Sequence, residues 1–271
     1  MRNKDLRTIN SPDRAGYDSH YDGVICFGGV DWWYHNRGHY DLQMMREVAN
    51  RGVPVLYVNS IGMRVPKLTE GAVLLQRLGR KISSLRRGLV SVRENFTVQS
   101  PFMLPARFGR DLLRRALSHQ VRKAAKTAGI QRPLVWVACP PAIQVLDDMN
   151  PVAVIYQRTD RFEEYPNVDR DVISNWDREL KKRADLTLYC SSLLFDEERE
   201  ECRRALFVDH GVDYDLFSAA GDRAREGKDD VLAGIPHPRV GYVGNLEPHR
   251  VDYRMFLKVA ENLSQLSFVV V

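Results

Sequence analysis

The segment VICFGGVDWWYHNRGHYDLQMMREVANRGVPVLYVNS, residues 24–60, determines which class of fold the sequence predicts. Its first apolar run ends at two glycines, which is typical of a buried parallel strand. Apolar residues then recur on one face of a helix, namely Leu42, Met45, Val48 and Ala49. Gly52 is a suitable helix end, and a second apolar run follows at 53–58. This strand–helix–strand order is the unit from which parallel sheets are built.

The same alternation continues along the chain. Further strands are expected within 89–104 (one or two strands), 133–140, 151–160, 185–192 and 205–212. Further helices are expected at 107–129, 141–149, 168–184 and 193–204. Because strands separated by helices form a parallel sheet covered on both faces, we expect an α/β fold with a doubly wound, Rossmann-like parallel sheet.

Composition predicts more than one domain. We expect a polar lead at 1–22, a Rossmann-like domain at 23–217, a linker at 218–236 and the start of a second Rossmann-like domain at 237–271. The linker is charged and contains glycine and proline, as connecting segments do. The sequence stops on the apolar run LSFVVV, so we expect the chain to be the front part of a longer protein.

The overall composition, with 44% hydrophobic and 28% charged residues, is that of a globular protein. No uncharged apolar stretch is long enough to span a membrane, and the polar N-terminus lacks a signal core. The four cysteines form no CxxC pair, which favours reduced thiols over a zinc site. The missing spanning segment and signal core favour a cytoplasmic protein. No dense cluster of metal ligands is visible in the sequence, so we expect no bound metal ion.

The net charge of +5 conceals a strong asymmetry. Residues 61–130 carry fifteen basic and three acidic side chains, a local charge of +12. The helix expected at 107–129 has an apolar stripe flanked by arginines: Phe108, Leu112, Leu113, Ala116, Leu117 and Val121. Such a helix can lie on an anionic membrane surface, and the alternative is a packed helix with a solvated basic face. Nucleic-acid binding is disfavoured because no known nucleic-acid module accompanies the charge.

Several nucleotide-binding classes are disfavoured by absent motifs. The sequence contains neither the dinucleotide fingerprint GxGxxG nor the phosphate-binding pattern GxxxxGK[ST]. A sugar-nucleotide oxidoreductase or epimerase would need a YxxxK pair, and Tyr253 and Lys258 have the wrong spacing for it. Neither a dehydrogenase nor a P-loop NTPase is therefore expected.

Several stretches, in chain order, resemble glycosyltransferases related to family 4, which have the GT-B fold. Residues 31–64, beginning DWWYHNRGHYDL, resemble the front of a bacterial cell-surface polysaccharide subgroup. PVAVIYQRTDRFEEY is similar to its YD…D…F segment, with Gln157 where an aspartate is usual, and ADLTLYCSSLLF fits the strand and turn that follow. HGVDYDLF looks like the end of the first domain, and residues 238–271 are similar to the start of the second.

The resemblance implies transfer of a sugar from a nucleotide-sugar donor to a lipid-linked or polysaccharide acceptor, without a metal ion or cofactor. It also implies retention of configuration at the anomeric carbon and work at the inner face of the plasma membrane. The E-x7-E signature of the second domain has no counterpart within 238–271. The alternative is therefore a non-catalytic nucleotide-sugar or glycan-binding module of the same fold.

Site residues are expected where strands end, because doubly wound sheets bind ligands at that edge. The predicted donor-phosphate contacts are Gly28, Gly29, Gly244, Asn245, His249 and Arg250. The predicted acceptor contacts are Asp31, Trp32, Trp33, Asn36, Arg37 and His39. The predicted catalytic residues are Asp160, a strand-end carboxylate able to deprotonate a hydroxyl, and His35. We expect the glycine-rich strand ends of the two domains to line a cleft between them.

Each of these expectations has a structural alternative. The Gly28–Gly29 pair can be a tight turn without a ligand, and the tryptophans can pack beneath the loop. The histidines can be structural or simply exposed. Asp160 can be a helix cap or an ion-pair partner, because Arg158 and Arg161 are close to it in the sequence. Glu163 and Glu164 are expected to be the solvated start of a helix.

Overall fold

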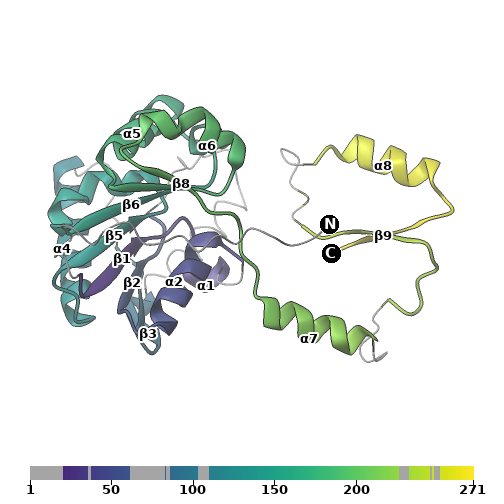
Figure 1. The fold of residues 1–271 in the computed structure, drawn as a ribbon, viewed down its shortest axis with the longest axis horizontal. Coiled ribbons are helices and arrows are strands. Elements are labelled where there is room, and N and C mark those ends of the chain that lie inside the picture. The colour runs from purple at the N-terminus through teal and green to yellow at the C-terminus, as the bar shows by residue number, and fades with distance from the viewer. Residues whose placement is uncertain are drawn as a thin grey trace, which may run out of the picture. The chain divides into compact units, whose positions relative to one another are not determined.

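The computed structural model of the chain describes residues 21–35, 38–61, 83, 86–102, 110–225, 232–244, 246 and 251–271. The chain forms two compact units, Met1–His210 and Gly211–Val271. The first unit confirms the predicted α/β class, with a large, mostly parallel sheet between helices (Figure 1).

The sheet of the first unit has eight strands in the order β3-β4-β2-β1-β5-β6-β7-β8. The strands are β1 (Gly23–Phe27), β2 (Val55–Val58), β3 (Leu89–Arg93), β4 (Phe96–Gln99), β5 (Pro133–Val137), β6 (Ala153–Arg158), β7 (Leu186–Tyr189) and β8 (Ala205–Phe207). Neighbouring strands are parallel except β3 and β4, which form an antiparallel hairpin. Asn95 turns this hairpin with a φ of 54°, a left-handed conformation that asparagine tolerates.

Helices cover both faces of this sheet, as predicted. On one face lie α1 (Trp32–His35) and α2 (Tyr40–Asn50), and on the other lie α4 (Arg110–Thr127), α5 (Arg170–Arg183) and η3 (Pro140–Val145). In the described part of the first unit, the further helical elements are η4 (Asp147–Met149), η5 (Phe162–Glu164), α6 (Ser192–Glu198) and η6 (Arg199–Glu201). The helix predicted at 141–149 is therefore a pair of 3-10 turns.

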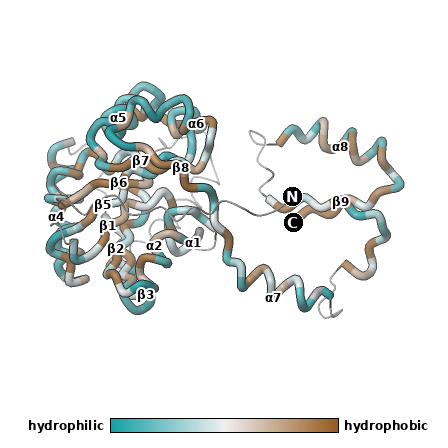
Figure 2. The backbone as a smooth tube through the Cα atoms, viewed as in Figure 1, coloured by the Kyte–Doolittle hydropathy of each residue, from teal (hydrophilic) through white to brown (hydrophobic). Residues whose placement is uncertain are grey.

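The central strands contribute side chains to two hydrophobic cores, one on each face of the sheet. In β1, Ile25 and Phe27 pack into the core beneath α4 and α5, while Val24 and Cys26 pack into the core beneath α2. This alternation follows from the opposite directions of successive side chains in a strand. Figure 2 shows the resulting hydrophobic strands in the middle of the unit and a mostly hydrophilic α5 on its outside.

The second unit contains α7 (Tyr214–Arg225), β9 (Arg239–Tyr242), α8 (Tyr253–Asn262) and β10 (Ser267–Val270). The strands β9 and β10 are parallel and are joined through α8, which is the strand–helix–strand order of a Rossmann-like unit, as expected for the start of a second such domain at 237–271. Phe256 of α8 packs edge-on against Tyr242 and Phe268, with ring centroids 6.2 and 6.1 Å away. Part of the linker expected at 218–236 is helical, since α7 continues to Arg225. This part of the sequence contains alanines, which favour a helix.

The basic helix α4 turns only part of its predicted apolar stripe toward the sheet, because Leu112 is 49% exposed. Leu117, Val121, Ala124 and Ala125 are buried in the core, so these side chains are not available to a lipid surface. Asp148 anchors the helix by accepting hydrogen bonds from Arg114 and Ser118 at 2.7 and 2.6 Å. The exposed face carries Arg115, Arg122, Lys123 and Lys126. Among the described residues, no helix is both long and apolar enough to cross a bilayer.

Candidate functional site

The switch point of the sheet lies between β1 and β5. The chain leaves β1 toward α2 on one face, and it leaves the neighbouring β5 toward η3 on the other. In doubly wound sheets, loops that diverge in this way border the usual ligand site at the carboxyl ends of the strands. The candidate site is therefore built from the loops that follow β1 and its neighbours.

The loop after β1 is a tight turn fixed from within the protein. The Gly28 amide donates to the carbonyl of Val58 at 2.9 Å, and the Gly29 amide donates to the Asp41 carboxylate at 2.8 Å. A Cβ atom on Gly28 would overlap the phenol ring of Tyr57. Glycine is thus required at position 28 for a steric reason, which corresponds to the tight-turn alternative.

These contacts bear on the predicted phosphate role of the two glycines. Both amides already donate to protein oxygens, so neither points an unused N–H group at a ligand in this conformation. Asp41, which the sequence analysis did not select, holds the turn from the first turn of α2 and is only 3% exposed.

Tyr57 joins this turn to the core. Its hydroxyl lies 2.8 Å from the Asp41 carboxylate and 3.1 Å from the Val30 carbonyl, both acceptors for its proton. Burial, followed by the charge of Asp41, raises the pKa of Tyr57 well above its ordinary value. The phenol therefore stays protonated and remains a donor.

The two tryptophans have different surroundings. Trp32 is 6% exposed and packs on Phe96 with ring centroids 4.8 Å apart, so it belongs to the core and cannot stack on a sugar without unpacking. Trp33 is half-buried, and its indole N–H donates to Ser100 at 3.0 Å. For Trp32 the packing alternative is therefore correct.

A buried polar network supports this helix. Asn59, at the end of β2, accepts from the Trp32 amide at 2.8 Å and donates to Ser100 Oγ at 2.9 Å. Asp31 caps the helix by accepting from the Trp33 amide at 2.9 Å. The structure thus brings Asp31 and Trp33 together with two polar residues that sequence reasoning missed. Their only sequence signal was a polar residue directly after an apolar run.

The remaining residues of this loop are described only in part. His39 is exposed and extended, immediately before α2. Asn36 and Arg37 lie outside the described residues, and so does the side chain of His35, although its backbone belongs to α1. Their predicted roles stay predictions.

Asp160 lies at the other side of the same edge, after β6. It is exposed and accepts a hydrogen bond of 2.6 Å from the hydroxyl of Tyr165. The half-buried Cys190 lies nearby, since its thiol donates to the Thr159 carbonyl at 3.6 Å. Burial, and then the charge of Asp160, raises the pKa of the Cys190 thiol, so the thiol is protonated and is no nucleophile at neutral pH.

Tyr40 connects the two sides of the edge. It begins α2, and its hydroxyl donates to the carbonyl of Val208, after β8, at 3.2 Å. Its ring meets the ring of His210 edge-on, with centroids 5.4 Å apart. The first turn of α2 therefore holds both the glycine turn, through Asp41, and the last residues of the first unit.

Arg158 does not lie beside Asp160 at the edge, as the sequence suggested, but points into the protein. The side chain is 1% exposed and pairs with Glu163 at 2.9 Å, Glu198 at 3.1 Å and Asp177 at 3.3 Å. Glu163 was expected to be solvated, and that expectation is wrong, because its side chain is 14% exposed and bound to Arg158. Glu164 is paired with Arg170 near the surface.

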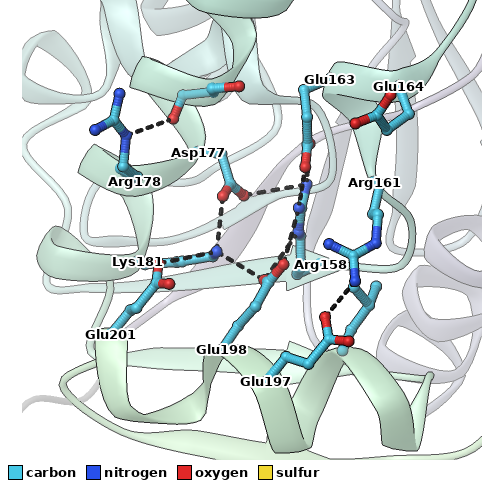
Figure 3. Close-up of polar contacts among 12 residues, drawn as sticks. Arg158, Arg161, Glu163, Glu164, Asp177, Arg178, Lys181, Glu197, Glu198 and Glu201 are labelled. Atoms are coloured by element: carbon cyan, nitrogen blue, oxygen red, sulfur yellow. Dashed lines mark hydrogen bonds and ion pairs between the residues drawn. The ribbon is translucent and has the colours of Figure 1, made fainter.

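Lys181 completes this buried charge cluster, defined as Arg158, Lys181, Glu163, Asp177 and Glu198 (Figure 3). Burial alone would raise the pKa of Glu198 and of Glu163, but hydrogen bonds from Arg158, and for Glu198 also from Lys181, lower both below their ordinary values. The carboxylates are therefore charged at neutral pH. The cluster joins β6, η5, α5 and α6, and so fixes the segment that carries Asp160.

The residues predicted in the second unit are mostly outside the described part. Gly244 follows β9, and its amide donates to the Val271 carbonyl at 3.1 Å. Asn245, His249 and Arg250 lie outside the described residues.

Two further observations concern ligands. In the described ranges, no group of three or more His, Cys, Asp or Glu side chains is arranged to hold a metal ion. A cavity of about 410 Å³ lies beside the first residues of β2 and β4, lined in part by Pro54, Asn95 and Thr127, and not at the loops described above. In comparisons with known proteins, no protein-family model matches the chain, and no curated protein does.

Proposed function

We propose that the chain is a glycosyltransferase of GT-B type, or the front part of one, that moves a sugar from a nucleotide-sugar donor to an acceptor hydroxyl. The observation that carries the proposal is the gathering of polar side chains at the carboxyl edge around the switch point. Asp31, Trp33 and Asn59 lie on one side and Asp160 with Tyr165 on the other. Doubly wound domains bind nucleotide-linked ligands at this edge.

In the proposed reaction, an acceptor hydroxyl oxygen forms a bond to the anomeric carbon of the sugar. The bond from that carbon to the diphosphate oxygen breaks, and the diphosphate leaves with the bonding electron pair. The hydroxyl proton passes to a carboxylate, for which Asp160 is the proposed acceptor. The leaving diphosphate needs nearby positive charge or N–H donors, because negative charge develops on it.

The neighbours of Asp160 fit a base that is held in place. Tyr165 donates to one carboxylate oxygen at 2.6 Å, which leaves the other oxygen to receive a proton from the acceptor. The rigid attachment of this segment to the buried charge cluster limits its movement. Positioning of this kind is a large part of the rate enhancement in enzymes.

Transfer assays with the full-length protein and a panel of nucleotide sugars test the proposal. We expect Asp160→Asn to lower kcat by about 10²- to 10⁴-fold with little change in the KM for the donor. Tyr165→Phe, which keeps the carboxylate, should have a much smaller effect. The proposal fails if no nucleotide sugar binds or turns over, or if the two variants lose activity equally.

We further propose that the protein works at the inner face of the plasma membrane on a lipid-linked or polysaccharide acceptor. The supporting observation is the exposed basic face of α4, which carries Arg122, Lys123 and Lys126. Each basic residue near an anionic surface contributes about 1 kcal/mol. Binding to anionic vesicles should fall when these residues are changed to glutamine and when salt is raised, and salt-independent binding would contradict the idea.

The second candidate function is a non-catalytic nucleotide-sugar or glycan-binding module of the same fold. It is favoured by the engagement of both glycine amides within the protein, so that neither of these two N–H groups is available to a ligand phosphate in this conformation. Calorimetry with nucleoside diphosphates and with glycan fragments separates the candidates when combined with the transfer assay. Ligand binding without any turnover would favour the binding module.

A further inference from the structure

Arg87 lies on the face of Trp33. Its guanidinium carbon is 4.4 Å from the centroid of the indole ring, well within the range of a cation–π contact. Arg87 is exposed and lies just before β3, whose first residue pairs with the last residue of β4. The stacked pair is therefore at the carboxyl edge, on the side of the candidate site that carries Asn59 and Ser100.

The indole is a fixed platform for the guanidinium. Its N–H donates to Ser100 at 3.0 Å, and the same hydroxyl oxygen accepts from Asn59 at 2.9 Å. Behind Arg87 the chain is also fixed, because the carbonyl of Gly88 accepts from the Ser100 amide at 2.8 Å. Gly88 has a φ of 61°, which few other residues adopt, and this directs the backbone at Arg87. The positive charge of Arg87 is thus held in one place, so binding a ligand would cost little further side-chain entropy.

Several arginines of the first unit have an anionic partner. Arg114, Arg161 and Arg203 each pair with a carboxylate, as buried Arg158 does with three. No carboxylate among the described residues pairs with Arg87, whose one contact of note is the indole. A positioned guanidinium without an anionic partner, at the edge where ligands bind, is suited to an anion.

We propose that Arg87, stacked on Trp33, binds a phosphate group of the ligand. The planar guanidinium offers parallel N–H groups that match two phosphate oxygens, and stacking on an aromatic ring leaves those N–H groups free to point outward. The inference deepens the proposed function and rests on it in one respect: the phosphate would belong to a diphosphate-bearing acceptor or to the donor diphosphate.

The indole N–H of Trp33 is the reporter of this site. In ¹H–¹⁵N spectra of the full chain at fixed ionic strength, the four tryptophans give four indole signals, and Trp33→Phe assigns the one of interest. We expect inorganic pyrophosphate to shift the Trp33 signal in a saturable way. Arg87→Gln should weaken this binding roughly 10- to 100-fold, since a charge-assisted bidentate contact is lost.

Two matched variants separate this site from general attraction to a basic protein. Arg115→Gln removes the same charge from the exposed face of α4 and should change the affinity less than about twofold. Arg87→Lys keeps the charge without the planar fork, and an intermediate affinity is expected. The inference is overturned if pyrophosphate does not shift the Trp33 signal, or if Arg87→Gln and Arg115→Gln weaken binding equally.

Two further titrations identify the source of the phosphate. A larger Trp33 shift with geranyl diphosphate than with uridine diphosphate assigns the site to a lipid-linked acceptor, and the reverse assigns it to the donor. Failure of the proposed function is distinguishable from failure of this inference. If no nucleotide sugar is turned over but the Arg87-dependent shift persists, the phosphate site stands without the transferase.

Discussion

The phenol ring of Tyr57 occupies the space that a Cβ atom on Gly28 would need. The distance from that Cβ position to Cε1 of the ring is 2.7 Å, and the hydroxyl is nearer still. The tyrosine cannot move aside easily, because it is fully buried and its hydroxyl is bound between Asp41 and Val30. The glycine at the end of β1 is thus set by the core of the protein as well as by any ligand.

Gly28→Ala should therefore destabilise the first unit by about 1–3 kcal/mol or more, through forced overlap in a packed core. Urea unfolding followed by tryptophan fluorescence measures the change. Gly38→Ala is the matched control, because nothing lies within 4 Å of a Cβ atom there, and it should change stability by less than about 0.5 kcal/mol. Equal stability of Gly28→Ala and the unchanged protein would contradict the steric argument.

Glu198 and its neighbour Glu197 allow a test of the buried charge cluster. Glu198 pairs with Arg158 and Lys181 and is 8% exposed at its side chain, whereas Glu197 pairs with Arg161 where both side chains are 43% exposed. Glu198→Gln should cost about 1–3 kcal/mol, because it removes the ion pairs of Glu198 with Arg158 and Lys181, although Glu163 and Asp177 still balance the two positive charges. Glu197→Gln should cost at most about 1 kcal/mol. Similar losses in urea unfolding would show that burial does not control the energy of these pairs.

The same cluster predicts how stability depends on pH. The pKa values of Glu163 and Glu198 are lowered in the folded state, so these carboxylates stabilise the fold above the ordinary glutamate pKa of about 4.3. Their contribution is lost as the pH falls through the lower, folded values. The pKa of Lys181 is raised, so its contribution is present below the ordinary lysine value of about 10.4 and is lost only above it.

The free energy of unfolding, measured between about pH 6 and pH 3, should therefore fall steadily on the acid side. Glu163→Gln should have a smaller slope in this range, since one of the groups that takes up a proton on unfolding has been removed. An identical slope in the variant and the unchanged protein would mean that Glu163 does not carry the effect.

The elements of the fold were largely predictable, because they depend on local periodicity. Alternating apolar runs and helical stripes predicted the strands of both units and the main helices of the first, whereas α7 lies largely in the expected linker. The site was less predictable. Trp32 and Trp33 are adjacent residues of the same type, and Trp32 belongs to the core because it packs on Tyr57 and Phe96, which lie far along the chain. No local pattern contains that contact.

Arg158 illustrates a second limit of the sequence. Because Arg158 is close to Asp160 in the sequence, the two side chains were expected to share a site. Strand β6 ends at Arg158, so the alternating directions of side chains in a strand do not predict where Asp160 points relative to Arg158. The partner Glu198 lies 40 positions later, on a helix whose place depends on the order of the strands. Long-range ion pairs of this kind follow from topology, which propensity and spacing do not fix.

Phe256 provides a final test, in the second unit. Its ring lies between Tyr242 of β9 and Phe268 of β10, so it joins α8 to both strands of a two-stranded sheet, and a pair of strands alone is only marginally stable. Phe256→Ala should lower the stability of this unit by about 1–3 kcal/mol.

All four tryptophans belong to the first unit, so tryptophan fluorescence reports that unit while circular dichroism reports both. We expect the variant to lose part of its helical signal at lower urea while the fluorescence midpoint is unchanged. Leu257→Ala, at a 57% exposed neighbouring position, is the control and should leave both signals unaltered. A shift of the fluorescence midpoint in Phe256→Ala would instead mean that the two units unfold together.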